Sequence, residues 1–343
     1  ACGTALGGVA GPATLRASAR SLGQAAAVTG CGAAADVLGM HEAPKGNAAA
    51  VTLALDQAKS ILTRDFTAAQ QGETRAGAAA RAALATAYSG QGLRAANARI
   101  TLATVQPTGA VSPLLAPEQP RLLAVPRGFA YPRVILAQTV AAKGSLPILH
   151  LLTSPDAATP YRISASATML PGSLVKPFDA LTRGSPLVTA AAGLAVAPTA
   201  LLKAYAAGMA FPAKVVTNPP FAADPFSAQV RAKADAVAKA VATQASFSQI
   251  HKVVPNSVYA VRQASGDALV FGIIERTDSF AVTSGQAVNT ADNKEFVLLS
   301  GKQRVTTSAT ITRLEFVVFA VPHARGQATL VAASDPVVAG SGS

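Results

Sequence analysis

Histidine is the side chain whose charge changes most readily near neutral pH, so the histidines are the first candidates for acid–base chemistry. They are His41, His150, His251 and His323. Only His150 lies inside a continuous apolar run, residues 146–152, so we expect it alone to be buried. Asp156 follows in a Ser-Pro-Asp sequence that is typical of a turn. The pattern favours a structural role for His150 over an acid–base pair of His150 with Asp156.

Other motifs of catalysis and metal binding are missing from the sequence. No two histidines stand at metal-ligand spacing, and no acidic cluster resembles a calcium loop. The chain has no Gly-x-Ser-x-Gly elbow, no phosphate loop and no dinucleotide fingerprint. The sequence therefore predicts no catalytic residue, no bound metal and no cofactor.

The two cysteines allow three states. Cys2 lies in Ala-Cys-Gly, which resembles a bacterial lipoprotein after its signal peptide is removed and would make Cys2 the lipid attachment site. Ala1 departs from this pattern because processing leaves the cysteine first. Alternatively, Cys2 and Cys31 form a disulfide, and closing the loop of 28 intervening residues would stabilise the fold by about 3–4 kcal/mol. Lipidation of Cys2 excludes this bridge; in the third state both thiols are free.

Two groups of residues could bind a ligand or a partner. Arg127, Tyr131 and Arg133 bracket a turn that contains Pro and Gly, where two guanidinium groups and a phenol could meet an anion. The alternative is that these arginines are solvated at the rim of a sheet. The second group is a Phe- and Pro-rich loop over residues 211–226, which is more typical of packing over a core than of an exposed apolar patch.

The chain is basic, with 29 Lys and Arg against 17 Asp and Glu and a net charge of +12. The basic residues are scattered singly, without interleaved aromatic residues, so the sequence does not predict nucleic-acid binding. A positive surface can attract anionic cell-wall polymers or lipid headgroups. The uncharged stretch 184–202 contains Pro186 and Pro198, so it does not predict a membrane span. A membrane contact would therefore come only from a lipid on Cys2.

Apolar spacing predicts helices before strands in each half of the chain. In the first half, helices are expected over 48–70, 75–88 and 92–101, and strands over 122–125, 134–140, 148–153 and 162–169. In the second half, one helix opens at Pro198 and another spans 222–244, before strands over 258–263, 269–277, 295–299, 306–312, 314–321 and 327–333. This repeated order predicts the α+β class, with helices packed on antiparallel strands.

A chain of 343 residues is longer than one hydrophobic core normally supports, so two domains are expected. The predicted parts are a low-complexity leader over 1–46, a first domain over 47–172, a linker over 173–197, a second domain over 198–335 and a tail over 336–343.

Several short motifs of the first half resemble those of a protein family. They are LLAVPRG over 122–128, YPRVILAQT over 131–139, the run 146–158, Pro160-Tyr161-Arg162, and MLPG over 169–172. They resemble an uncharacterised family of secreted actinobacterial lipoproteins, with a likeness that extends over residues 48–333. The resemblance implies two tandem copies of the cone-shaped nuclear transport factor 2 fold, in which helices pack into the concavity of a curved antiparallel sheet. It implies an exported location and no particular chemistry.

In such a fold we expect apolar side chains to close both concavities, so that any ligand binds on an outer surface. The expected lining of the first concavity consists of Leu55, Ile61, Phe66, Leu84, Val134, Leu136 and Ile148. Asp56 and Asp65 lie off the apolar stripe of the first helix, so we expect both to face water with ordinary pKa values.

These features predict a non-catalytic, exported envelope protein that binds a protein partner or cell-wall component, outside the cell or at the outer face of the cytoplasmic membrane. The first alternative is a self-assembling surface protein, because open sheets with alanine-rich helices permit contacts between identical chains. The second alternative is an enzyme of unknown type.

Overall fold

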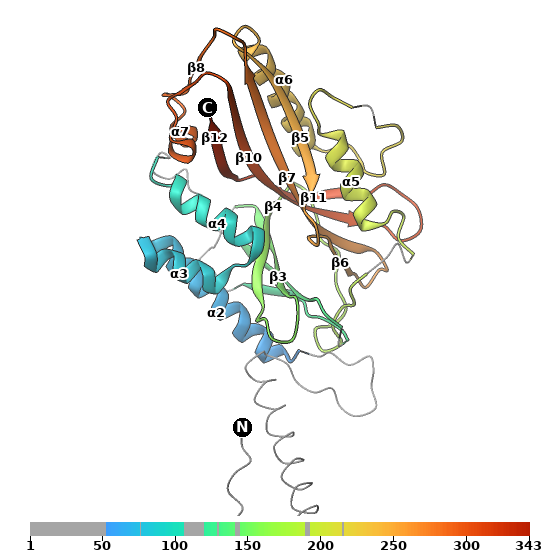
Figure 1. Cartoon of the computed structure of the whole chain (residues 1–343). Helices are drawn as coiled ribbons and strands as arrows, with labels where there is room; N and C mark the ends of the chain where they lie inside the picture. The colour runs from blue at the N-terminus through green and yellow to red at the C-terminus, as the bar shows by residue number, and fades with distance from the viewer. Residues whose placement is uncertain are drawn as a thin grey trace, which may run out of the picture.

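The structure is a computed structural model, and it describes residues 53–75, 77–105, 120–128, 130–140, 145–188, 193–214 and 216–343 (Figure 1). The predicted leader lies outside the described residues. So do Cys2 and Cys31, and with them both the lipid attachment and the disulfide.

Three helices open the described chain, as the sequence predicted. They are α2 (Leu55–Thr74), α3 (Gly77–Ala87) and α4 (Gly90–Leu102). The buried face of α2 includes Ala58, Ile61, Leu62 and Phe66, which recur at helical spacing. Gly92 lets α4 lie directly on the next strands, because a Cβ there would stand 2.7 Å from the backbone oxygen of Ile163.

Four antiparallel strands follow, and they confirm the predicted meander. They are β1 (Arg121–Ala124), β2 (Arg133–Val140), β3 (Pro147–Ser154) and β4 (Arg162–Met169). The register places His150 between Ala137 of β2 and Ser166 of β4. Most residues of β2 and β3 are buried, so both faces of this part of the sheet are covered.

The second half also begins with helices, α5 (Pro198–Gly208) and α6 (Pro225–Val241). Each has proline in its first turn, where the missing N–H is not needed. The strands that follow are β5 (Ala245–Val253), β6 (Tyr259–Arg262), β7 (Ala268–Val282), β10 (Ser308–Val321), β11 (Thr329–Ser334) and β12 (Val337–Gly342). Two short strands, β8 (Val288–Asn289) and β9 (Arg304–Val305), flank the short helix α7 (Lys294–Ser300).

Several predicted elements of the second half were wrong. Residues 295–299, predicted as a strand, belong to α7, because Asn293 accepts a hydrogen bond from the Phe296 N–H and Gly301 ends the helix in the left-handed region. The predicted strands 306–312 and 314–321 are one strand, β10, which continues through Arg313. The polar segment that forms β5 and the tail residues that form β12 were not predicted as strands.

One antiparallel sheet joins both halves of the chain, in the order β1-β2-β3-β4-β11-β10-β7-β5, with β12 paired to β10 and β6 to β7. The halves meet where β4 pairs with β11, through Thr168 with Ala333 and Met169 with Ala332. Figure 1 shows α2, α3 and α4 beside the first strands, and α5 and α6 beside β5. The fold is mixed α+β, with helices packed against a large antiparallel sheet.

The core has a central cluster that both halves build. Leu149 and Leu151 of β3 share this cluster with Phe271 of β7 and Phe316 of β10. The helices cover the outer faces: α2, α3 and α4 form a second cluster with the first strands, and α5 forms a third with the second strands.

Two residues predicted to face the helices lie on the opposite side of the sheet. Val134 and Leu136 belong to the central cluster, whereas their neighbours Ile135 and Ala137 meet the helices. The prediction was wrong because β2 is apolar on both faces, and alternation cannot then show which face meets which layer.

The predicted linker is attached to both halves. Val188 donates a backbone hydrogen bond to Ala260, and Ser185 donates one to Val125. Lys176 forms an ion pair with Asp267 at 2.5 Å. The division of the chain into two domains stays a prediction.

Asp267 fixes the linker to the turn after β10. Its carboxylate also accepts hydrogen bonds from the backbone N–H of His323 (2.9 Å), from the His323 ring (2.8 Å) and from Ser265 (3.0 Å). Burial alone would raise the pKa of this carboxyl, but the hydrogen bonds from Lys176, His323 and Ser265 hold it well below its usual range.

Replacing Asp267 with asparagine is expected to lower the free energy of unfolding by about 1–3 kcal/mol at pH 7, because several bonds to a charged acceptor are weakened. Since the pKa is lower in the folded state, this advantage is present above about pH 4 and is lost as the pH falls below that value. Urea denaturation at pH 7 and at pH 3 measures the difference. Asp235 on the exposed face of α6 is the control, and an equal loss in Asp235→Asn would contradict the prediction.

Candidate functional site

A groove of about 730 Å³ lies between α5 and β5, the last strand in the order of the large sheet; we call it the β5 groove. One wall is α5, with Lys203, Ala206 and Ala207, and the other is residues 248–253 of β5; Ala210 follows the end of α5. The chain after α5 closes one side with Phe211, Pro212 and Lys214.

The sequence of α5 explains why the groove is open. Its opposite face carries Leu201, Leu202 and Tyr205, which are fully buried in the core. Leu202 can approach β7 closely because residue 272 is glycine; a Cβ there would lie 1.9 Å from Leu202 Cδ1. Toward β5 the helix carries the small residues Ala206 and Ala207, so it leaves space above the strand edge.

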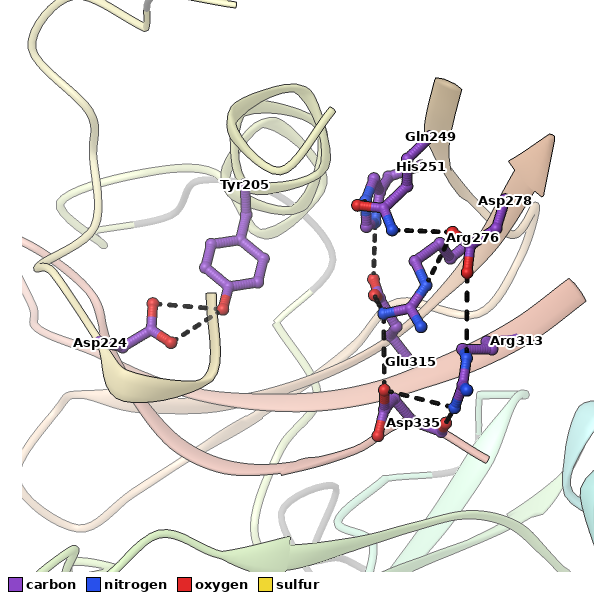
Figure 2. Close-up of polar contacts among 9 residues, drawn as sticks. All are labelled: Tyr205, Asp224, Gln249, His251, Arg276, Asp278, Arg313, Glu315 and Asp335. Atoms are coloured by element: carbon purple, nitrogen blue, oxygen red, sulfur yellow. Dashed lines mark hydrogen bonds and ion pairs between the residues drawn. The ribbon is translucent and has the colours of Figure 1, made fainter. Parts of the chain in front are cut away.

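Below the groove lies a cluster of charged and polar side chains, which we call the charge cluster (Figure 2). Its members are Gln249 and His251 of β5, Arg276 and Asp278 of β7, Arg313 and Glu315 of β10, and Asp335. Within each strand the two members are two residues apart, so all six strand residues point to the same face of the sheet. Gln249 and His251 also line the groove.

Glu315 is the buried centre of the charge cluster. Its carboxylate lies 2.9 Å from His251 Nδ1 and accepts a hydrogen bond from Arg276 at 3.2 Å. The side chains of Glu315 and His251 are both fully buried. Arg276 also lies 3.3 Å from Asp278 and 3.4 Å from Asp335.

The ring of His251 is held at both nitrogens. Gln249 donates its amide to Asp278 at 2.7 Å, which turns its oxygen toward His251 Nε2 at 3.0 Å. Both partners of the ring are side-chain oxygens of this chain, so both ring nitrogens are engaged within the protein. Neither ring nitrogen is therefore open to a ligand.

Tyr205 and Asp224 form a second polar contact, separate from the charge cluster in Figure 2. The phenol donates to both carboxylate oxygens of Asp224, at 3.1 and 3.2 Å. Burial, and then the negative charge of Asp224, raise the pKa of Tyr205. Asp224 also caps α6 by accepting the Ser227 N–H at 2.8 Å, so this pair holds α5 and α6 together.

The Phe- and Pro-rich loop divides between two roles. Phe221 packs edge-on against Tyr205, with ring centroids 5.0 Å apart. Phe221 and Phe226 both pack against the apolar cluster that α5 forms with the strands of the second half. This confirms the predicted packing over a core for those two residues. Phe211 instead lines the β5 groove.

His150 is fully buried, as predicted, and its role is structural. Its ring nitrogens lie 2.8 Å from Thr139 Oγ1 and 2.8 Å from Ser166 Oγ. Burial lowers the pKa of His150 to about 3, so the ring is neutral. Asp156 caps an exposed turn by accepting the N–H groups of Ala158 and Thr159, so the alternative acid–base pair is not formed. The expectation that no other histidine is buried was wrong, because His251 is buried too.

Asp65 does not face water as predicted. Its side chain lies on the buried face of α2 and is fully buried, and Arg64 donates a hydrogen bond to its Oδ1 at 2.7 Å. Burial raises the pKa of Asp65 to about 6, although the hydrogen bond and charge of Arg64 act to lower it. Asp56, in the first turn of the same helix, is exposed as expected.

Of the predicted anion-binding residues, Tyr131 and Arg133 lie against each other, and Arg127 is engaged with a different segment of the chain. Arg127 forms an ion pair with Asp179 and donates to the backbone oxygen of Gly184. Arg133 is buried, with its guanidinium 4.4 Å from the centroid of the Tyr131 ring. A role of these residues in binding anions stays a prediction.

Sequence reasoning missed the charge cluster. The available signal was the spacing of charged or polar residues two apart in strands that are otherwise apolar, as in Arg276-Thr277-Asp278 and Arg313-Leu314-Glu315. Such charges on one face of neighbouring strands must pair with each other, because no buried charge is stable alone.

Neither a metal site nor a membrane helix is found in the described part of the chain. No three His, Cys, Asp or Glu residues of that part come together as metal ligands. None of its helices combines the length and apolar character needed to cross a membrane.

Comparisons with protein families, with curated proteins and with solved structures find no match to this chain. The resemblance to the actinobacterial lipoprotein family therefore stays a prediction.

Proposed function

We propose that this chain is a non-catalytic binding protein whose ligand occupies the β5 groove. The observation that carries the proposal is the combination of apolar groove walls with a floor whose polar side chains are already paired. Ala206, Ala207 and Pro212 offer apolar contact, while Gln249 and His251 are held by the charge cluster. A preformed apolar groove with a rigid floor favours binding, because little conformational freedom is lost.

Catalysis is the weaker interpretation of the same groove. An acid–base catalyst needs a titratable group that can exchange a proton with the ligand. The histidine on the floor, His251, has both of its ring nitrogens engaged inside the protein, and the lysines of the lining are exposed at the rim. The groove thus supplies shape and charge rather than a reactive group.

We further infer that the protein acts in the cell envelope after export, on a protein partner or cell-wall component. The motif resemblance to secreted lipoproteins supports this location. The same resemblance supports two tandem copies of a cone-shaped fold, as does the order of helices before strands in each half of the chain. An anchoring lipid on Cys2 belongs to this proposal.

Blocking the groove tests the binding proposal. Ala207 lines the groove and is exposed, so Ala207→Trp fills the groove without disturbing the core. We expect the dye 8-anilinonaphthalene-1-sulfonate, which is apolar and anionic, to bind the unmodified protein at this site. Ala207→Trp should weaken that binding about tenfold or more, through loss of the apolar contact area.

Ala200→Trp is the matched control, because Ala200 is exposed on the same helix and lies outside the groove. Fluorescence titration measures both variants beside the unmodified protein. Equal affinity of all three for the dye would show that the groove is not the binding site.

A further inference from the structure

The outer edge of β5 has backbone groups that could form hydrogen bonds with another strand along the groove. β5 ends the order of the large sheet, with β7 as its neighbour on one side. On the other side, Phe211 exchanges two backbone hydrogen bonds with Gln249, at 2.8 and 2.9 Å. An extended segment of this chain therefore already pairs with that edge.

Beyond Phe211 the same edge continues into the groove. Backbone groups in an antiparallel strand point alternately to one neighbour and to the other. Since those of Gln249 point away from β7, the N–H and C=O groups of His251 and Val253 point the same way. Both residues line the groove, so their backbone groups face the space that a ligand would fill.

The rim of the groove is positive. Lys203, Lys214 and Lys252 stand around it, and all three are exposed. The residues that line the groove include no aspartate or glutamate, so these charges are not balanced within the lining. Ile250 adds an apolar side chain that is 49% exposed.

We propose that the β5 groove binds an acidic peptide in extended conformation, which pairs with β5 at His251 and Val253. This inference rests on the proposed function and names its ligand class. Main-chain hydrogen bonds hold the peptide as an added strand. Acidic side chains meet the three lysines, and apolar side chains between them contact the alanines of α5.

A fluorescein-labelled peptide of alternating glutamate and valine is the probe, studied by fluorescence anisotropy with the full chain. We expect it to bind, and a lysine–valine peptide of equal length not to bind. The affinity should fall as salt rises. The variant Lys203→Glu/Lys214→Glu/Lys252→Glu should bind the glutamate–valine peptide about tenfold more weakly or worse, because three exposed ion pairs are lost and repulsion is added. If that variant fails to fold, Lys203→Gln/Lys214→Gln/Lys252→Gln replaces it, with a smaller loss.

A glutamate–valine peptide with every backbone nitrogen methylated separates strand pairing from simple charge attraction. It keeps the side chains but cannot donate backbone hydrogen bonds, so we expect much weaker binding. Amide hydrogen exchange should show slower exchange at His251 and Val253 when the unmethylated peptide is bound.

Three outcomes would overturn the inference: equal binding of the methylated peptide, unchanged exchange at His251 and Val253, or a groove that binds palmitate but no acidic peptide. The last result would assign an anionic amphiphile instead. If the dye binds in a way that Ala207→Trp abolishes while no acidic peptide binds, the proposed function stands and only the ligand class fails. If neither the dye nor an acidic peptide binds in the groove, both the proposed function and the ligand class are refuted.

Discussion

Replacing Glu315 with glutamine is expected to lower the free energy of unfolding by about 3–5 kcal/mol at pH 7. The side chain of Glu315 is fully buried and contacts both His251 and Arg276. Removing its negative charge deprives Arg276 of its most buried counter-charge, without a change in side-chain size. Most single domains have only about 5–15 kcal/mol of stability, so this is a large fraction of the whole. Chemical denaturation followed by circular dichroism measures the loss.

Glu275→Gln is the matched control. Glu275 neighbours Arg276 in β7 and forms an ion pair with Arg94 at 2.6 Å, but both side chains are 37% exposed. An ion pair of this kind contributes less than about 1 kcal/mol. Similar losses in Glu315→Gln and Glu275→Gln would show that the charge cluster does not stabilise the fold as a buried unit.

A paired substitution separates charge balance from packing. Arg276→Met combined with Glu315→Leu removes one positive and one negative charge together and fills the space with apolar atoms. We expect this double variant to lose less stability than Glu315→Gln alone, because no buried charge is left without a counterpart. A loss equal to or greater than that of the single variant would contradict the charge-balance explanation.

Replacing Asp65 with asparagine is expected to stabilise the protein by about 1–3 kcal/mol at pH 7.5. Each pKa unit corresponds to about 1.4 kcal/mol, and the pKa of Asp65 is raised from an ordinary value of about 4 to about 6. The ionised carboxylate is therefore less stable in the fold than in the unfolded chain. Its Oδ2 is buried and has no hydrogen-bond partner within the described residues, which agrees with this cost.

The pH dependence gives the sign. Between about pH 4 and pH 6 the folded chain holds a proton on Asp65 that the unfolded chain has released, so this residue makes stability fall as the pH rises. The difference between Asp65→Asn and the unmodified protein should therefore be largest above pH 6 and should vanish near pH 4. Thermal unfolding at several pH values tests this. Asp56→Asn, on the exposed face of the same helix, should change stability by less than about 0.5 kcal/mol.

A stabilising effect of Asp65→Asn that is the same at pH 4 and pH 7.5 would show that desolvation of the charge is not its cause. A destabilised variant at pH 7.5 would show that the hydrogen bond from Arg64 outweighs burial.

Local signals in the sequence predicted most elements of the fold. Helical spacing in α2 and the proline that opens α5 were sufficient for those helices. The strand β4 was predicted with its observed bounds, because polar and apolar residues alternate between Arg162 and Met169. α7 was missed because Val297, Leu298 and Leu299 suggest a strand, whereas the capping residue Asn293 and Gly301 decide for a helix.

The charge cluster was harder to predict, because its residues come from four separate segments: β5, β7, β10 and Asp335. His251 lies in a polar segment that the sequence did not predict as a strand. Its partner Glu315 is 64 residues away, and only the register of β5, β7 and β10 brings the two together. The three lysines of the groove are among 29 basic residues, and no local sequence pattern distinguishes them from the others.

The sequence by itself determined the α+β class, most helices and strands, and the buried, structural character of His150, because spacing and apolar runs act over a few residues. The tertiary structure decided that one sheet joins both halves, that Val134 and Leu136 face the central cluster, and that Asp65 is buried. It also decided which charges meet below the β5 groove. These features depend on pairing between distant strands, and a one-residue change of register would turn every side chain of a strand to the other face.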